Sequence, residues 1–429
     1  MGVFGPIQNP ILRLHALPEQ YLLRSLSLIR SESISLKTRC LGHGALLERV
    51  KYRTNILLQC FQMWVIFSGL SLISLTFLLF ILSCATFVPG VSDMPKAISS
   101  ASLDLLTKPK LSQLTFHIQE YSVPMNDSAP LYPLYDENRN VIWIGDTAID
   151  SSRILEFNLT SEKFIEHKLN GTSIVTVMAF DHNNNNQIWY VDPLLKHLGH
   201  YDPSANTTKL YNIPTRGTIS RIVIDSNDNV WLTSPNSNEL LRFNSQAKNF
   251  TMIHLPTMNA MPIGILLDKA TGMIWIAEGI GKLASIDPIK NYKINEYPMP
   301  ATNNTYYIPT ELFMSKVPGD NLYVSDHDNH TISVFDLKLK TFKTYPVFNP
   351  SALPFGMAMD SYGYLWVAEH TTNKIAVIDP ETGLSREIEI PKSNPYIQFL
   401  ASDSKGNIWF AEQRGNSLGV ITHSPIKPR

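Results

Sequence analysis

Acidic side chains recur at one position of a repeated segment in this chain. Seven segments carry a polar residue three positions after an aromatic residue. The seven polar residues are Asp146, Asp192, Ser234, Glu278, Asp326, Glu369 and Glu412. If such carboxylates meet, their mutual repulsion raises their pKa values unless a cation compensates. Mg²⁺ or Ca²⁺ would compensate, because both are hard cations that take oxygen ligands.

The pattern therefore makes four of these carboxylates candidate metal ligands: Glu412, Glu369, Glu278 and Asp326. The alternative is architectural, with each carboxylate accepting backbone N–H bonds inside its own repeat or a neighbouring one. An acid that recurs in nearly every repeat is more often structural than catalytic.

Histidines follow two of these acids in adjacent repeats. His327 comes directly after Asp326, and His370 comes directly after Glu369. A histidine beside a carboxylate can act as a general base or a metal ligand. We therefore take His370 and His327 as candidate catalytic residues.

The repeat itself identifies the elements that must position these groups. Its aromatic residues are Trp143, Trp189, Trp231, Trp275, Tyr323, Trp366 and Trp409, at intervals of 46, 42, 44, 48, 43 and 43 residues. Short strand-like segments at a period of this size are typical of four-stranded propeller blades. The sequence predicts an all-β fold, a seven-bladed β-propeller over residues 113–424. In such a ring, the loop after each second strand opens near the central channel, so we expect these side chains at the channel mouth.

The ends of the repeat predict how the ring closes. After Trp409 the chain supplies one more strand, at 418–422, so the seventh blade lacks its outer strand. Residues 115–124 precede the first blade and resemble the outer strand at 293–300. Pairing 115–124 into the last blade would close the ring and remove an exposed sheet edge.

A long uncharged segment precedes the propeller. Residues 63–88 are predicted to form a transmembrane helix, because the 25 residues from Trp64 to Val88 would rise about 37 Å. Residues 1–62 carry eight Lys and Arg, which places this segment in the cytoplasm by the positive-inside rule. Residues 89–112 are expected to form a polar stalk, with the propeller outside a cell membrane that the chain crosses once.

Two other readings of this region stay open. Met63 could be the true start, which would leave a signal-like N-terminus without a basic region. Alternatively, the segment ending at Cys84 resembles a lipoprotein cleavage site.

Composition excludes several classes of function. The formal net charge is −1, which argues against a nucleic-acid partner. All three cysteines, Cys40, Cys60 and Cys84, precede the propeller, so it has no disulfide framework, cysteine zinc site or cysteine nucleophile.

Several phrases of the repeat resemble a known family. WVAEH, WFAEQRGNSLGVI and PFGMAMD are similar to the repeats of streptogramin B (virginiamycin B) lyases over residues 115–422. The resemblance implies a magnesium ion and a catalytic histidine near the channel mouth, which open a cyclic depsipeptide by elimination at an ester linkage.

The same resemblance assigns roles to single positions. Glu412 matches a metal-binding glutamate, while Tyr396 stands at the first metal-binding glutamate and Gln398 at the proton-abstracting histidine. Phe355 stands at a substrate-contacting histidine, and Leu131, with Tyr132 adjacent, at a substrate-contacting tyrosine. Gln398, Phe355 and Tyr396 are therefore candidate ligand-binding residues. Because Gln cannot act as a general base near neutral pH, these replacements put catalysis in doubt.

Three functions are consistent with these residues. The first is a membrane-anchored propeller that binds a small-molecule or peptide ligand at its mouth without turnover. The second is a metal-dependent lyase for an ester-containing cyclic peptide, with a rearranged site. The third is a lactone hydrolase like the gluconolactonase-type propellers.

The predicted topology can be tested on intact cells. Protease added outside should digest the propeller or its stalk and leave residues 1–62 protected, because only the former are expected outside the membrane. Immunoblotting with tags at both ends measures this. Digestion of residues 1–62 with a protected propeller would reverse the orientation.

Overall fold

A computed structural model describes residues 108–426, except 182, 183, 185, 301–307, 315–320 and 347–350. The predicted cytoplasmic segment, the predicted membrane helix and all but the end of the predicted stalk lie outside the described residues. Within the part that is described, no helix has the length and apolar character needed to cross a membrane.

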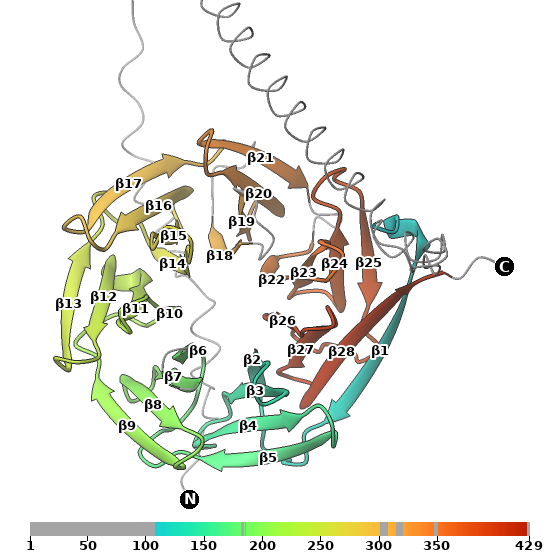
Figure 1. Ribbon diagram of the computed structural model, residues 1–429, viewed down its shortest axis with the longest axis horizontal. Helices are drawn as coiled ribbons and strands as arrows, with labels where there is room; N and C mark the ends of the chain where they lie inside the picture. Colours follow the sequence, from blue (N-terminus) through green and yellow to red (C-terminus); the bar gives the residue numbers. More distant parts are fainter. Residues whose placement is uncertain are drawn as a thin grey trace, which may run out of the picture. The chain divides into compact units, whose positions relative to one another are not determined.

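The described chain forms seven four-stranded antiparallel sheets, which confirms the predicted seven-bladed propeller. Figure 1 shows the sheets around a common centre, with β2, β6, β10, β14, β18, β22 and β26 innermost. Within six of the sheets, each strand pairs with the next one along the chain.

The strands of the first four blades are as follows. Blade 1 contains β2 (Pro130–Asp136), β3 (Val141–Asp146), β4 (Arg153–Asn158) and β5 (Lys163–Lys168). Blade 2 contains β6 (Met178–Asp181), β7 (Gln187–Asp192), β8 (His197–Asp202) and β9 (Thr207–Asn212). Blade 3 contains β10 (Ile222–Ile224), β11 (Val230–Ser234), β12 (Glu239–Asn244) and β13 (Asn249–His254). Blade 4 contains β14 (Pro262–Leu267), β15 (Ile274–Glu278), β16 (Lys282–Asp287) and β17 (Lys293–Pro298).

The last three blades complete the ring. Blade 5 contains β18 (Pro309–Met314), β19 (Asn321–Asp326), β20 (Thr331–Asp336) and β21 (Thr341–Pro346). Blade 6 contains β22 (Pro354–Met359), β23 (Leu365–Glu369), β24 (Lys374–Ile378) and β25 (Ser385–Glu389). Blade 7 contains β26 (Leu400–Ser402), β27 (Ile408–Glu412), β28 (Ser417–Pro425) and β1 (Leu114–Ser122). Short 3-10 turns occur at Leu111–Gln113 and Pro235–Ser237.

Blade 7 is built from both ends of the described chain. β1 pairs with β28 in antiparallel register from Leu114 opposite Pro425 to Ser122 opposite Ser417. Figure 1 shows the two strands side by side at the outer edge of the last blade. The predicted closure is therefore confirmed; β1 ends two residues earlier than the expected 115–124, and β28 extends beyond the expected 418–422 at both ends.

A buried hydrogen bond holds the first hairpin of most blades. In blade 6, the Trp366 indole Nε1 donates to Asp360 at 2.9 Å, and the other carboxylate oxygen of Asp360 accepts the Tyr362 and Tyr364 backbone N–H groups at 2.9 Å. One aspartate thus fixes both the turn and the tryptophan, because a buried indole N–H needs an acceptor. The same bond joins Trp143–Asp136, Trp189–Asp181, Trp231–Asp225 and Trp409–Asp403.

Aromatic side chains fill the outer space between several neighbouring blades. Each set contains the tryptophan and an outer-strand tyrosine of one blade and two phenylalanines of the next blade. We call such a set an interblade ring cluster. The three sets are Trp409, Tyr121, Phe157 and Phe164; Trp189, Tyr211, Phe243 and Phe250; and Trp275, Tyr297, Phe335 and Phe342.

Closure of the ring can be locked covalently. Thr115 and Ser424 are cross-strand partners with exposed side chains, and the propeller contains no cysteine. The double change Thr115→Cys and Ser424→Cys should form an intramolecular disulfide, because antiparallel partners lie about 4.5–5.5 Å apart. The bond should add roughly 2–4 kcal/mol to the free energy of unfolding, since it closes a very long loop.

Thermal unfolding with and without reductant measures this gain. The single variant Thr115→Cys is the control and should unfold like the parent chain. If the double variant forms no internal disulfide under oxidising conditions, β1 does not pair with β28.

Candidate functional site: the channel mouth

Two histidines from adjacent blades touch at one face of the ring. His327 follows β19 and His370 follows β23, and their Nε2 atoms lie 3.4 Å apart. The His327 backbone N–H donates to Ile308, and that of His370 donates to Leu353. Each loop is therefore tied to the segment that enters the inner strand of its own blade. The structure brings together the two histidines that the sequence selected.

A carboxylate orients the first of these rings. His327 Nδ1 lies 3.2 Å from an Asp328 carboxylate oxygen. Because the carboxylate can only accept, it favours the tautomer in which Nδ1 carries the proton. Nε2 of His327 is then the acceptor, and His370 Nε2–H donates to it. Asp328, His327 and His370 thus form a chain of polar contacts.

Aromatic rings surround the histidine pair. The Phe355 ring centroid lies 5.3 Å from that of His370 and 6.2 Å from that of His327. The Tyr396 ring lies 5.2 Å from His370 on the other side, with the Arg414 guanidinium 4.1 Å above it. Tyr396 has a left-handed backbone, with φ of 56°, so its placement depends on a strained turn.

Gln398 lies beside these aromatic rings. Its side chain is buried and hydrogen-bonded to Tyr396, and its backbone carbonyl accepts the Gly356 N–H at 2.8 Å. Burial raises the pKa of the Tyr396 phenol, which therefore stays protonated near neutral pH. We call His327, His370, Phe355, Tyr396 and Gln398 the mouth cluster. All five were selected from the sequence, and they come from blades 5, 6 and 7.

An ion pair that the sequence did not predict crosses the channel beside this cluster. Arg221 Nε donates to Glu311 at 2.7 Å, although the two residues belong to blades 3 and 5. The Arg221 guanidinium also lies 4.6 Å from the Phe399 ring centroid and 5.2 Å from that of Phe355. Residues on the inner strands of non-adjacent blades can meet only across the central channel. Arg221 and Glu311 therefore form a floor next to the mouth cluster.

A sequence signal for this pair existed in the repeat. Gly264 and Gly356 each stand four residues before the aspartate of their blade, and Arg221 stands four before Asp225. The position has no fixed residue, since Tyr132, Val177 and Phe399 stand there in blades 1, 2 and 7, and Arg221 is distinguished by its charge alone. The spacing did not reveal which residue across the ring would be its partner.

The four carboxylates selected as metal ligands lie in different surroundings. Each is the last residue of a second strand and is buried. Asp326 accepts hydrogen bonds from Asn329, and Glu369 accepts one from Thr372 at 2.9 Å. Glu412 lies 3.6 Å from the Lys392 ammonium. The Glu278 carboxylate oxygens accept no hydrogen bond from the described residues.

The structure does not bring these carboxylates together. The charged groups that act on Glu278 are Lys282 and Glu296, on the third and outer strands of the same blade. Glu412 is influenced by Glu120 on the outer strand β1. These side chains therefore lie toward the outer part of their blades. Within the described ranges, no three His, Cys, Asp or Glu side chains are placed to share a metal ion.

This arrangement does not fit the Mg²⁺ or Ca²⁺ site expected at the mouth. Both ions need several converging oxygen ligands. Here Glu412 already faces an ammonium group, and the other candidate carboxylates occupy separate blades.

Burial changes the acid strength of two of these groups. It raises the pKa of Glu278 to about 8, with a further increase from the Glu296 carboxylate and a decrease from Lys282. It raises the pKa of Glu412 to about 7, with Glu120 adding to the shift and Lys392 opposing it. Burial also raises the pKa of Glu369 and Asp326.

Comparison with known proteins agrees with this architecture. A family model described as the SMP-30/gluconolactonase/LRE-like region matches residues 316–408. A streptogramin B lyase structure aligns with a TM-score of 0.64 and 18% identity, over 72% of this chain and 98% of the lyase. This chain has the fold of the streptogramin B lyases.

Two further structures of that fold align with the chain. Virginiamycin B lyase from Staphylococcus aureus aligns with a TM-score of 0.63 and 19% identity, over 72% of this chain and 99% of the enzyme. A catalytically inactive variant of that enzyme, solved with quinupristin, aligns with a TM-score of 0.51 and 18% identity, over 73% of this chain and 90% of the variant. No curated protein has a significant match to the sequence.

The buried Glu278 should make the stability of the propeller depend on pH. Its carboxyl has a pKa near 8 when folded and near 4.5 when unfolded, so the folded state binds the extra proton. Unfolding free energy should therefore fall as pH rises from about 4.5 through about 8. Glu278→Gln should reduce this dependence, with Glu412 still contributing, and add roughly 1–3 kcal/mol at pH 8.

Denaturant unfolding at pH 5 and pH 8 measures the effect. Glu137→Gln, in an exposed turn of blade 1, is the matched control and should leave the free energy of unfolding unchanged at both pH values. Equal pH dependence in Glu278→Gln and the parent chain would show that this carboxyl does not titrate on unfolding.

Proposed function

We propose that this chain is a membrane-anchored, extracytoplasmic propeller that binds a small-molecule or peptide ligand at its channel mouth. The observation that supports this most directly is the mouth cluster. It combines two imidazoles, two aromatic faces and an amide at one end of the channel, on loops held by backbone hydrogen bonds. Binding sites commonly pair aromatic surface with a few placed polar groups.

The floor beside the cluster also favours a ligand that binds at the mouth. The Arg221–Glu311 ion pair spans the channel, and Phe399 packs between Arg221 and Tyr132, at 4.5 Å from the Tyr132 ring. Arg221 and Phe399 both pack against Phe355 of the mouth cluster. A ligand at this face would therefore rest on them and contact His370 and Tyr396.

A protein that binds its ligand without converting it does not need the catalytic residues that are replaced at this channel mouth. Gln398 stands where the resemblance implies a proton-abstracting histidine, and an amide does not accept a proton near neutral pH. Tyr396 stands where it implies a metal-binding glutamate, and its buried phenol stays protonated. Glu412, the remaining expected ligand, faces Lys392.

One observation favours a second candidate function. The Asp328–His327–His370 chain has the contacts of an oriented base, because the carboxylate holds one imidazole and that imidazole accepts from the next. A relocated histidine base would support a lyase acting on an ester-containing cyclic peptide, or a lactone hydrolase. Arrival of substrate would have to displace one histidine from the other.

The membrane anchor in this proposal is supported by sequence alone. Residues 63–88 are uncharged and long enough to span a bilayer, and basic residues are concentrated before them. An anchored binding domain would present its mouth to ligands outside the cell.

Quinupristin is a suitable probe of the mouth, since it is a ligand of a protein with this fold. We expect the purified chain to bind it without added metal and to leave it chemically intact. His370→Ala should weaken binding about tenfold, because it removes both a hydrogen-bonding group and a stacked ring. Calorimetric titration measures affinity, and mass spectrometry after incubation measures turnover.

The control variant is His254→Ala, which changes an exposed histidine on the outer strand of blade 3. It should bind like the parent chain. Ring opening at unchanged mass would establish the lyase function, and ring opening with gain of one water would establish hydrolysis. Equal affinity in His370→Ala and the parent chain would place the ligand elsewhere.

A further inference from the structure

The outer part of the interface between blades 5 and 6 lacks most of the aromatic side chains that form the interblade ring clusters at three other interfaces. In each interblade ring cluster, the tryptophan of one blade lies 5.6 or 5.7 Å from a phenylalanine of the next. At blades 5 and 6 the tryptophan position holds Tyr323, and the two phenylalanine positions hold Ile378 and Ser385. Only the outer-strand tyrosine, Tyr345, is retained.

The register of the strands establishes these equivalences. Phe335 pairs with Phe342 across β20 and β21, and Ile378 pairs with Ser385 across β24 and β25. Phe335 also lies opposite Leu322, the residue before the blade 5 anchor, and Ile378 lies opposite Leu365, the residue before the blade 6 anchor. The interface between blades 5 and 6 therefore has one smaller ring and two missing rings.

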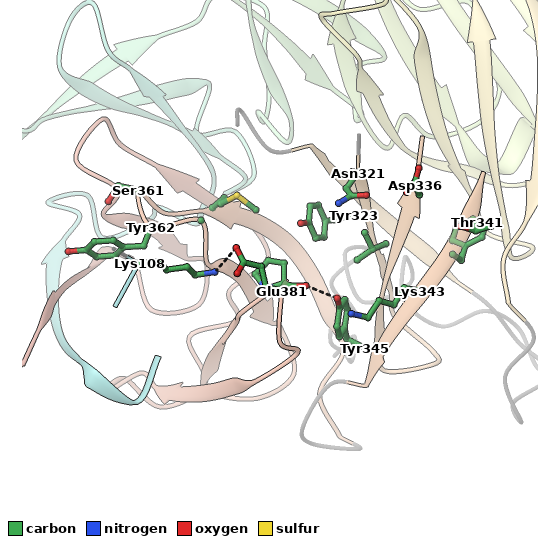
Figure 2. A pocket seen from close by; sticks show the side chains of 15 residues that line it. Lys108, Asn321, Tyr323, Asp336, Thr341, Lys343, Tyr345, Ser361, Tyr362 and Glu381 are labelled. Atoms are coloured by element: carbon green, nitrogen blue, oxygen red, sulfur yellow. Dashed lines mark hydrogen bonds and ion pairs between the residues drawn. The ribbon is translucent and has the colours of Figure 1, made fainter. Parts of the chain in front are cut away.

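A cavity of about 590 Å³ lies at this place. Its walls include Tyr323, Tyr345 and Val334 from blade 5, and Met359, Tyr362 and Glu381 from blade 6. Figure 2 shows Tyr323 and Tyr345 on one side and Lys108 and Tyr362 on the other, with Glu381 between Lys108 and Tyr345 and the Tyr362 ring directed away from them. The volume is in the range of small-molecule sites, about 300–1,000 Å³. Of the three positions that differ from the ring clusters, only Tyr323 lines the cavity; Ile378 and Ser385 are not part of its wall.

Two polar groups in the wall, a hydroxyl and an ammonium, make no hydrogen bond or ion pair with the described residues. The Tyr323 hydroxyl has no hydrogen bond to the described residues, and burial raises its pKa to about 12, so it is a donor at neutral pH. The Lys343 ammonium lies 4.5 Å from the Tyr345 ring centroid and has no ion pair with the described residues. By contrast, Lys108 at the opposite wall is paired with Asp379 at 2.6 Å.

We propose that this cavity is a second binding site, separate from the mouth, for a small aromatic molecule that carries a carboxylate. An aromatic ring would lie in the cavity against the Tyr323 and Tyr345 rings. Its carboxylate would accept hydrogen bonds from the Lys343 ammonium and the Tyr323 hydroxyl. A charge-assisted bond of this kind is stronger than a neutral one.

Three probes separate the two parts of this recognition. Indole-3-acetate has the ring and the charge, indole has only the ring, and cyclohexylacetate has the charge on a non-aromatic body. Calorimetric titration of the full chain should detect indole-3-acetate with a Kd on the order of 1 mM or tighter. Indole and cyclohexylacetate should each bind about tenfold more weakly. Failure of indole-3-acetate to bind overturns the proposal.

A larger ring at position 323 should fill the site. Tyr323→Trp restores the tryptophan of the other blades in the wall of the cavity and removes the hydroxyl, so it should weaken indole-3-acetate binding about tenfold. Lys343→Met keeps the cavity and removes the charge, so it should weaken indole-3-acetate about tenfold and leave indole unchanged. This surface change also tests the proposal if Tyr323→Trp does not fold.

Matched controls locate the binding. Lys340→Met removes a lysine of the β20–β21 turn beside the filled cluster of blades 4 and 5, where its ammonium lies 5.4 Å from the Trp275 ring centroid, and should leave indole-3-acetate binding unchanged. His370→Ala alters the mouth and should also leave indole-3-acetate binding unchanged, so the two sites are tested separately. Full binding in Tyr323→Trp, or loss of binding in His370→Ala, overturns the proposal.

Discussion

The pairing of β1 with β28 joins two ends of a chain separated by about 300 positions, and the position of every blade depends on it. Thr115 bonds Ser424 across a sequence separation of 309 residues. Without β1, blade 7 would present an open edge to solvent, and blade 1 would lose Tyr121 from the cluster that joins it to blade 7. Closure therefore contributes a complete outer strand and part of an interblade core. It also fixes the angle at which seven inner strands approach one axis.

Because the inner strands converge on one axis, side chains from different blades come into contact inside the channel. Arg221 and Glu311 meet from blades 3 and 5, and Phe355 and Phe399 pack on the guanidinium from blades 6 and 7. A charge pair removed from water retains most of its attraction only with close geometry and further contacts. Here the Arg221 Nη1 group also donates to the Ser220 carbonyl at 2.7 Å. The channel interior is thus a packed polar and aromatic layer, and the mouth cluster lies beside it.

The blades use a common framework with local exceptions, and the exceptions coincide with the candidate sites. Blade 5 has a tyrosine in place of the tryptophan, and the cavity opens beside it. Blades 5 and 6 carry histidines after their second strands, and these form the pair at the mouth. Repetition allows each exception to be compared with equivalent positions that keep the regular residue. This comparison makes the missing rings between blades 5 and 6 recognisable as a loss of volume.

The sequence by itself determined the number of blades, the strand order and the closing strand. These follow from alternating patterns and a constant period, which act within a few residues or between neighbouring repeats. It also placed His327 and His370 at one face, because the loops after second strands share a face in a propeller, and the resemblance to the lyase repeats selected Phe355, Tyr396 and Gln398. Only the tertiary structure decided where the carboxylates of Glu278, Asp326, Glu369 and Glu412 lie. Their direction depends on the pleat of each strand and on charged neighbours such as Lys392, which the period does not encode. The Arg221–Glu311 contact and the cavity beside Tyr323 were decided in the same way, since they depend on how separate blades meet in space.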